Sequence, residues 1–221
     1  MAGGNHMEQE HALTVLRTVK EKGPSRKFTQ SVDLVINLKD IDLKKTDQQL
    51  DLYVTLHYPY GKEVKVCGLV GPELFDEAKN FCHHVIRQDE FASLTPKDIK
   101  QLAKDYDYFV AQANVMPQVA QTFGRILGPR GKMPNPKAGC VVPPKTNLEP
   151  LIKRLQQTVR VQAKKDPVLH LKVGSETQDE AQVADNIAYL YKQITVHLPL
   201  EENNIKNALL KLTMGTPEAL K

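Results

Sequence analysis

Short strand-like runs alternate with helix-like segments through the middle of this chain, and that alternation restricts the folds open to it. The apolar runs lie at 64–70, 84–87, 107–112 and 139–142. Helical spacing of apolar residues falls between them, at 73–82, 117–126 and 148–159. Thr95 and Pro96 supply the N-cap and first-turn residue of one more helix. This alternation predicts a mostly parallel, Rossmann-like sheet.

The two ends of the chain carry longer elements. A helix is predicted over 8–22, where Gly23 and Pro24 stop it. A second helix is indicated by apolar residues that step by four, three and four, namely Val183, Ile187, Leu190 and Ile194. Strand patterns lie at 32–38, 50–58 and 167–173. Residues 205–212 fit either a closing strand, paired with the early strands, or a helix.

These patterns predict an α/β protein with two domains. We expect a discontinuous α+β domain built from residues 1–66 and 159–221. An α/β domain at 67–158 is expected to be inserted into it.

The composition excludes several classes of protein. With 41% hydrophobic and 25% charged residues among 221, the chain is neither disordered nor collagen-like. No run approaches the roughly 18 apolar residues of a membrane span, and the polar start lacks a secretory signal. Residues 1–6 fit an expression scar before a natural start at Met7. The scattered Cys67, Cys82 and Cys140 fit reduced thiols in a cytoplasmic protein.

The net charge of +4 permits a nucleic-acid partner without locating it. Residues 1–66 carry a net charge of +1, residues 67–158 carry +3 and residues 159–221 carry none. Because no segment is a polycationic tail, any nucleic-acid binding must use local patches.

The clearest patch is the segment 124–137, GRILGPRGKMPNPK, which holds Arg125, Arg130, Lys132 and Lys137 and no acidic residue. Its glycines and prolines predict a loop. Such a loop suits phosphate contacts, and a solvated basic loop is the alternative. The segment is not a P-loop, because Met133 follows Gly131-Lys132 and Ile126 occupies the position of the first glycine.

Two further basic stretches are less distinctive. Lys153, Arg154, Arg160, Lys164 and Lys165 fit the solvated face of a helix and the chain behind it. The stretch from Lys20 to Lys27 precedes Phe28, whose ring can stack on a base or ribose as in single-stranded RNA readers. The pattern alone favours the alternative, in which Phe28 is an edge residue of the core.

No catalytic or metal-binding pattern is present in the sequence. There is no GxSxG, the seven histidines are dispersed, and adjacent His83 and His84 would point to opposite faces of a strand. His170 fits a structural histidine better than a base. We therefore predict no enzyme activity, no cofactor and no metal.

Four motifs in order resemble one family. RKFTQSVDLVINLKDIDLKK at 26–45 and ILGPRGKMPNPKAG at 126–139 are highly specific, and LHLKVGSE at 169–176 and KLTMGTP at 211–217 support them. The chain resembles the large-subunit ribosomal protein "L-one" family, found on the mobile stalk beside the tRNA exit site, and its archaeal branch in particular.

The resemblance implies a two-domain fold and a ribosomal location in the cytoplasm. Implied partners are the large-subunit rRNA, the protein's own mRNA, which family members bind as translational repressors, and exit-site tRNA, whose release they assist. No membrane is implied.

The resemblance also implies a site. The main RNA surface would lie on the two-ended domain, at Lys27, Phe28, Thr29, Gln30, His170, Lys172, Gly174, Ser175, Glu176, Thr213, Met214, Gly215 and Thr216. Ser175 stands where bacterial members often carry Lys. Arg125, Arg130, Lys132 and Lys137 of the inserted domain would give secondary RNA contacts.

Two other functions stay open on the sequence. A nucleotide-binding α/β enzyme would bind ATP at the Gly131 loop. A general single-stranded nucleic-acid-binding protein would not discriminate a folded stem-loop from unstructured RNA of equal length.

Overall fold

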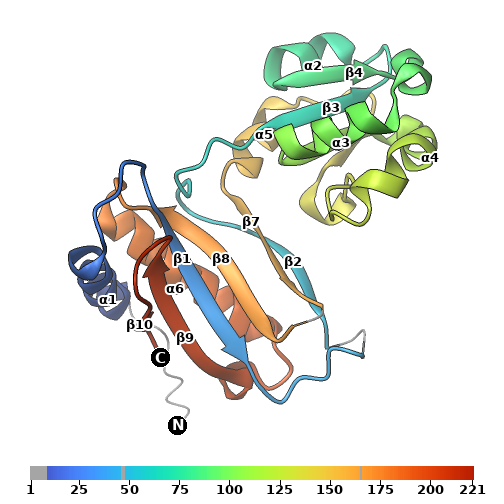
Figure 1. Ribbon diagram of the computed structural model, residues 1–221. Coiled ribbons are helices and arrows are strands. Elements are labelled where there is room, and N and C mark those ends of the chain that lie inside the picture. Colours follow the sequence, from blue (N-terminus) through green and yellow to red (C-terminus); the bar gives the residue numbers. More distant parts are fainter. Residues whose placement is uncertain (1–8, 46–47, 165) are drawn as a thin grey trace. The chain divides into compact units, whose positions relative to one another are not determined.

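The computed structural model describes residues 9–45, 48–164 and 166–221, so the expected scar at 1–6 and the start at Met7 lie outside the described residues. The chain divides into two compact units (Figure 1). Unit 1 is Met1–Lys62 with Gln157–Lys221, and unit 2 is Glu63–Gln156. These divisions lie four and two residues from the expected boundaries, 66/67 and 158/159.

Unit 1 is an α+β unit around a four-stranded antiparallel sheet. Its elements are α1 (Gln9–Lys22), β1 (Ser31–Leu38), β2 (Leu50–Thr55), β7 (Thr158–Ala163), β8 (Val168–Ser175), α6 (Glu180–His197), the 3₁₀ turn η4 (Glu201–Asn204), β9 (Ile205–Leu212) and β10 (Glu218–Ala219). The strand order is β10-β9-β1-β8. Of the two alternatives for 205–212, the strand is confirmed, and it pairs with β1 as expected.

One face of this sheet is covered by α6, which lies behind it in Figure 1, and α1 packs against α6 and beside β9 and β10. The burial of β1 alternates strictly, with Val32, Leu34, Ile36 and Leu38 buried as their spacing predicts. The partly exposed residues between them face away from the helices. The unit therefore has a covered face and an open face.

The predicted helix at 148–159 is wrong at its C-terminal end. Helix α5 (Glu149–Leu155) stops at Leu155, and Thr158 begins β7. Strand β7 pairs with β2 in an antiparallel ribbon, with Thr158 opposite Thr55 and Ala163 opposite Leu50. The β-branched residues Thr158, Val159 and Val161 favour a strand once a partner strand is available, which helical spacing alone does not show.

Unit 2 has the predicted parallel sheet, in the order β4-β3-β5-β6. Its elements are β3 (Val66–Val70), α2 (Phe75–Phe81), β4 (His84–Arg87), η1 (Gln88–Ser93), α3 (Pro96–Asp105), β5 (Tyr108–Gln112), η2 (Ala113–Val115), α4 (Met116–Leu127), η3 (Pro136–Ala138), β6 (Val141–Val142) and α5. Every residue of β3 is buried, because helices cover both sheet faces. Cys67 and Leu69 pack with α3 and α4, while Gly68 faces Ala78 of α2.

Local signals position the helices of unit 2. Thr95 caps α3 by accepting a hydrogen bond from the Asp98 amide, and Asp98 accepts one from the Thr95 amide, which forms a capping box. The loop predicted from residue 124 begins later, because α4 continues to Leu127. Val119, Phe123 and Leu127 form one continuous buried stripe, and burying Leu127 keeps Gly124 and Arg125 helical.

Among the described residues, no helix is both long and apolar enough to cross a membrane. Cys67, Cys82 and Cys140 are free thiols. Burial raises the pKa values of Cys82 and Cys140 to about 11, so both stay protonated at neutral pH.

Candidate nucleic-acid interface

The antiparallel sheet of unit 1 brings three distant segments to one end. The start of β1 lies beside the end of β8, with Ser31 opposite Ser175, and beside the end of β9. The Thr213 amide donates to the Ser31 carbonyl at 3.1 Å, and the Glu176 amide donates to the Gln30 carbonyl at 3.0 Å. The residues predicted from 27–30, 174–176 and 213–216 thus form one surface, which we call the strand-end surface.

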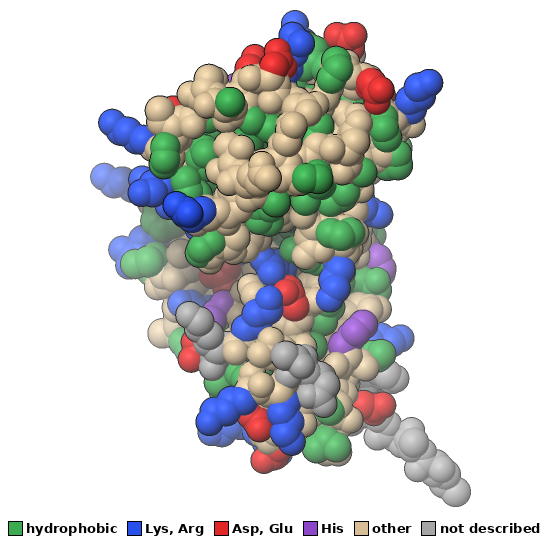
Figure 2. Space-filling model, turned by 90° about the vertical axis from the view of Figure 1, so that its right-hand side faces the viewer, with side chains coloured by type: hydrophobic (Ala, Val, Ile, Leu, Met, Phe, Trp, Pro, Cys, Tyr) green, Lys and Arg blue, Asp and Glu red, His purple; other side chains and the backbone are tan. Residues whose placement is uncertain are grey.

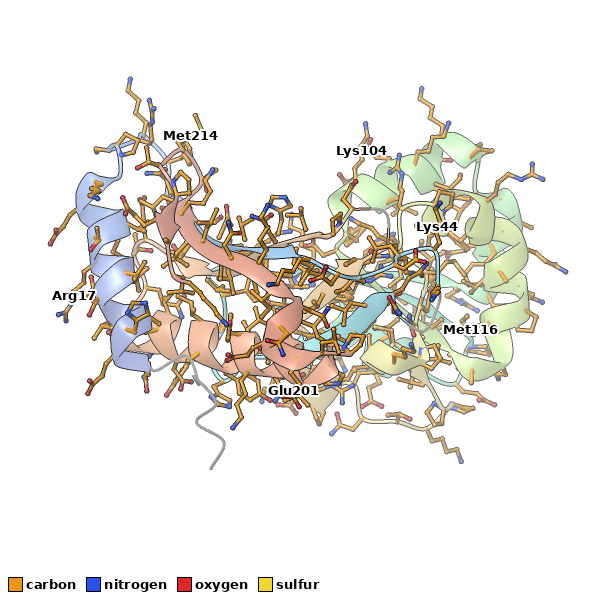
Figure 3. The ribbon with its side chains drawn as sticks, turned by 90° about the horizontal axis from the view of Figure 1, so that it is seen from below. Arg17, Lys44, Lys104, Met116, Glu201 and Met214 are labelled. Atoms are coloured by element: carbon orange, nitrogen blue, oxygen red, sulfur yellow. The ribbon has the colours of Figure 1, made fainter. Side chains whose placement is uncertain are left out.

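The exposed part of the strand-end surface comes from residues 27–29 and 213–216. Lys27, Phe28, Thr29, Thr213, Met214 and Thr216 are exposed. The Phe28 ring is 52% exposed and Met214 is 54% exposed. The alternative in which Phe28 belongs to the core is therefore wrong. Met214 lies on the turn after β9 and is free to contact a partner (Figure 3).

Two other predicted residues are buried and support the surface from below. A Cβ atom on Gly174 would lie 2.7 Å from the Val183 Cγ2 atom of α6, so only glycine lets β8 approach that helix. Ser175 is 5% exposed, and a Cβ atom on Gly61 would lie 2.6 Å from its Cβ. Gly61 has φ +72°, which glycine adopts without strain. A lysine at 175 would have to leave this packed site.

Gln30 is also buried, at 1% exposure, and connects the three segments. Its main-chain amide donates to Glu176 Oε1 at 2.8 Å, and its side-chain Oε1 accepts from the Met214 amide at 3.1 Å. Its Nε2 donates to the Pro24 carbonyl at 2.9 Å and to Glu176 Oε2 at 3.3 Å. The sequence motif pointed to Gln30, but nothing in it distinguished a buried connector from an RNA contact.

His170 and Lys172 lie along β8 on the open face of the sheet, with His170 exposed. Lys172 is paired across the ladder with Asp33, whose other neighbour is Lys211. Burial raises the pKa of Asp33, against the opposing effect of Lys211, Lys172 and His170. Desolvation and the nearby Lys62 lower the pKa of Lys172. The open face therefore carries mixed charge rather than a cationic strip.

Sequence reasoning missed Asp33, Lys211 and a hollow next to Gln30. Alternation along β1 puts Asp33 on the open face, but pairing it with Lys172 and Lys211 requires the strand register. The hollow has a volume of about 340 Å³ and is lined by Lys20, Gly23, Pro24, Ser25, Arg26, Gln30, Glu176 and Leu212. The cations among these residues were noted in the sequence only as a basic stretch.

The four basic residues predicted for secondary contacts divide into two kinds. Lys132 is half-buried, and its Nζ donates to the Ala103 and Tyr106 carbonyls of the end of α3 at 2.9 and 2.6 Å. Arg130 donates to the Lys100 carbonyl of the same helix at 3.3 Å. Arg125 and Lys137 are exposed. The Lys132 charge thus neutralises the negative end of a helix dipole within unit 2.

The second basic stretch does not form one surface. Lys153 pairs with Glu149 at 2.6 Å, and Arg160 and Lys164 pair with Asp51 at 3.1 and 2.7 Å. Lys165 lies outside the described residues. Figure 2 shows Lys and Arg side chains in separate groups over the visible face, with acidic side chains among them.

The geometry of unit 2 argues against a nucleotide site. In a doubly wound sheet, phosphates bind at the carboxyl ends of the strands where the strand order reverses, here between β3 and β5. Buried Gln112 fills that position: its Oε1 accepts from the Gly71 amide at 2.9 Å, and its Nε2 donates to Glu73 at 3.2 Å. The Gly71 amide is already hydrogen-bonded to Gln112, and the negative charge of the Glu73 carboxylate repels a phosphate. Both disfavour phosphate binding at this position. No cluster of metal-ligating side chains occurs within the described ranges.

Comparison with known proteins gives matches over almost the whole chain. The model of the "Ribosomal protein L1p/L10e family" matches residues 18–216. Three similar proteins are each named "Large ribosomal subunit protein uL1". That of Thermococcus kodakarensis is 37% identical over 211 residues, covering 94% of this chain and 95% of its own. That of Methanothermococcus thermolithotrophicus is 38% identical over 213 residues, covering 96% and 98%. That of Methanothermobacter thermautotrophicus is 39% identical over 210 residues, covering 94% and 97%.

Proposed function

Because this chain belongs to the ribosomal protein L1p/L10e family, and to its archaeal type, we propose that it is a structural constituent of the large ribosomal subunit that binds rRNA through unit 1. Its location is then the ribosome, and it is assigned no catalytic activity. The relatives' names support the ribosomal assignment, and the strand-end surface supports the choice of unit.

The observation that carries the choice of unit 1 is the convergence of three motifs on the strand-end surface. Exposed Phe28 and Met214 lie on segments joined by hydrogen bonds through Gln30 and Ser31. Structured RNA is recognised through its shape, ribose hydroxyls and unstacked bases, and small polar groups around a few apolar side chains suit that task. A polycationic patch is not needed for it.

Phosphate attraction supplements this recognition. Lys27 and Arg26 lie beside Phe28, and Lys172 lies on the adjacent open face. Each phosphate that these residues neutralise is expected to contribute roughly −0.7 to −0.9 to the slope of the logarithm of the binding constant against the logarithm of the salt concentration. Arg125 and Lys137 are proposed as secondary RNA contacts, since both are exposed. Arg130 and Lys132 are proposed to contribute less, since both contact α3.

Two finer roles are proposed from the family resemblance. The same surface would bind a similar element on the protein's own mRNA and so repress its translation. On the ribosome the protein would assist movement and release of exit-site tRNA. Neither role requires chemistry from this chain.

Selective binding is the direct test of the proposal. We expect the full chain to bind a folded stem-loop of large-subunit stalk rRNA more tightly than unstructured RNA of equal length at the same salt concentration. Equal affinities would favour the general single-stranded binder, and binding of ATP in a nucleotide titration would favour the enzyme.

Two substitutions test the surface itself. Phe28→Ala and Met214→Ala should each weaken stem-loop binding, Phe28→Ala by about fivefold or more, because stacking of an aromatic ring on a base contributes about 1–3 kcal/mol. Both side chains are more than half exposed, so the midpoint of urea unfolding should not change. Arg125→Ala is the matched control and should lower affinity only slightly. Unchanged affinity in both variants would show that the strand-end surface is not the site.

A further inference from the structure

We infer that buried Gln30 and half-buried Glu176 form a brace that positions the Met214 turn for RNA, so that Gln30 is a positioning residue and not an RNA contact. This inference rests on the proposed function of the strand-end surface and extends it. It attributes the position of the Met214 turn within that surface to the side-chain amide of Gln30.

The hydrogen bonds around Gln30 leave little freedom for the three segments. Its side-chain Oε1 accepts from the Met214 amide at 3.1 Å, which fixes the turn after β9. Its Nε2 donates to the Pro24 carbonyl and to Glu176 Oε2, which fixes the chain after α1 and the end of β8. The main-chain groups of Gln30 also bond to Glu176. The Gln30 main-chain amide donates to Glu176 Oε1 at 2.8 Å, and the Gln30 carbonyl accepts from the Glu176 main-chain amide at 3.0 Å.

An amide is the side chain that this position requires. One end must accept from a main-chain amide, while the other must donate both to a carbonyl and to a carboxylate. A carboxylate at position 30 accepts but does not donate, and it would face Glu176 at close range. An apolar side chain would leave the Met214 amide and the Pro24 carbonyl without this partner, at a cost of several-fold to more than a hundredfold in an equilibrium constant.

Burial makes the brace stiff. Gln30 is almost fully buried, and hydrogen bonds are stronger where water is excluded. A turn that is already held in its bound geometry loses less conformational entropy when RNA binds. The brace adds no binding contact of its own for Met214 or Phe28. It acts by keeping the turn that carries Met214 in one position.

The proposed test is Gln30→Glu, because it makes the brace depend on pH. Above neutral pH, two facing carboxylates should repel and release the Met214 turn, and stem-loop affinity should fall by about tenfold or more relative to wild type. At acidic pH one shared proton restores a donor between positions 30 and 176, so the ratio to wild type should return to within about threefold. The cationic residues that line the adjoining hollow are Lys20 and Arg26.

A second variant tests the brace by exchanging the amide and the carboxylate between positions 30 and 176. In Gln30→Glu with Glu176→Gln, the amide lies at 176 and the carboxylate at 30, so one donor again faces one acceptor, while the Pro24 carbonyl stays without its donor from position 30. We expect this pair to recover part of the affinity that Gln30→Glu loses, at neutral and alkaline pH. Simple damage to folding would not be repaired by a second substitution at the contact.

Unit 2 offers a closely matched control. Gln112 is equally buried, accepts from the Gly71 amide and donates to the Glu73 carboxylate. Gln112→Glu therefore creates the same facing pair of carboxylates away from the proposed RNA surface. It should lower the urea midpoint comparably while leaving stem-loop affinity at the wild-type value at every pH.

The outcomes separate the brace from the proposed function. An affinity of Gln30→Glu that equals wild type, or that is lower at all pH values with no recovery in the exchanged pair, would overturn the brace. If wild type itself does not prefer the stem-loop, the proposed function fails instead. The Met214 methyl resonance of the free protein then decides the brace: it should shift with pH in Gln30→Glu and not in Gln112→Glu, and no such shift would overturn it.

Discussion

At the scale of the single residue, the same basic side chain serves different ends according to where its charged group lies. Lys132 and Lys137 belong to one Gly- and Pro-rich segment and look alike in sequence. The Lys132 ammonium contacts two carbonyls at the end of α3, whereas Lys137 is exposed. Only the exposed one is free to attract a phosphate without breaking an existing contact.

Lys132→Met should therefore destabilise unit 2 more than it weakens RNA binding. It removes charged hydrogen bonds to Ala103 and Tyr106 and the favourable interaction with the helix dipole, which together stabilise by about 1–2 kcal/mol. Urea unfolding followed by circular dichroism measures the loss. Lys137→Met is the control and should leave the midpoint unchanged. Equal midpoints for both variants would contradict the assigned capping role.

At the scale of the element, the strand-end surface depends on how closely β8 approaches α6. Gly174 is the point of contact, because its missing Cβ makes room for Val183. The helix in turn is held against the sheet by a continuous buried face that includes Ile187, Leu190 and Ile194. A change in this packing would move the end of β8, which carries Ser175 and Glu176.

Gly174→Ala should lower the free energy of unfolding by about 1–3 kcal/mol, since the added methyl lies 2.7 Å from a Val183 methyl. The two substitutions should be coupled. In a Val183→Ala background, the further cost of Gly174→Ala should fall below about 0.5 kcal/mol, as a double-mutant cycle in urea would measure. Additive costs would mean that the strain arises elsewhere.

At the scale of the whole molecule, unit 2 is inserted between two strands of unit 1 that pair with each other. β2 precedes the insertion and β7 follows it, and the Leu56 amide donates to the Gln157 carbonyl at 2.9 Å. The two ends of unit 2 also meet, since the Gln156 side chain bonds to both main-chain groups of Val64 at 2.8 Å. The chain therefore enters and leaves each unit at residues that are hydrogen-bonded to each other, which is typical of independently packed domains.

Replacing residues 63–156 by a short Gly-rich linker should leave a folded unit 1 that still prefers the stem-loop. We expect its affinity to fall by less than about tenfold at moderate salt, because only secondary phosphate contacts are lost. Gel-shift titration of the shortened and full chains measures the difference. A shortened chain that is folded by circular dichroism but no longer discriminates the stem-loop would assign specific binding to unit 2.

Much of the fold could be predicted from local signals in the sequence. The N-cap at Thr95, the stop at Gly23-Pro24 and the alternation of β1 are short-range patterns whose physical causes act within one or two turns of chain. The end of α5 and the strand β7 could not be predicted in this way. Residues 158–163 become a strand because β2 lies beside them, and that pairing joins residues about a hundred positions apart.

The sequence by itself determined which segments carry the candidate site, because the motifs at 26–30, 169–176 and 211–217 are contiguous strings of residues. Only the tertiary structure decided which of their members are exposed and which are buried. Phe28 and Met214 are exposed, while Gln30, Gly174 and Ser175 are buried beneath them. Burial and hydrogen-bond partners depend on what the antiparallel register brings alongside a residue, and residues far apart in sequence supply those neighbours.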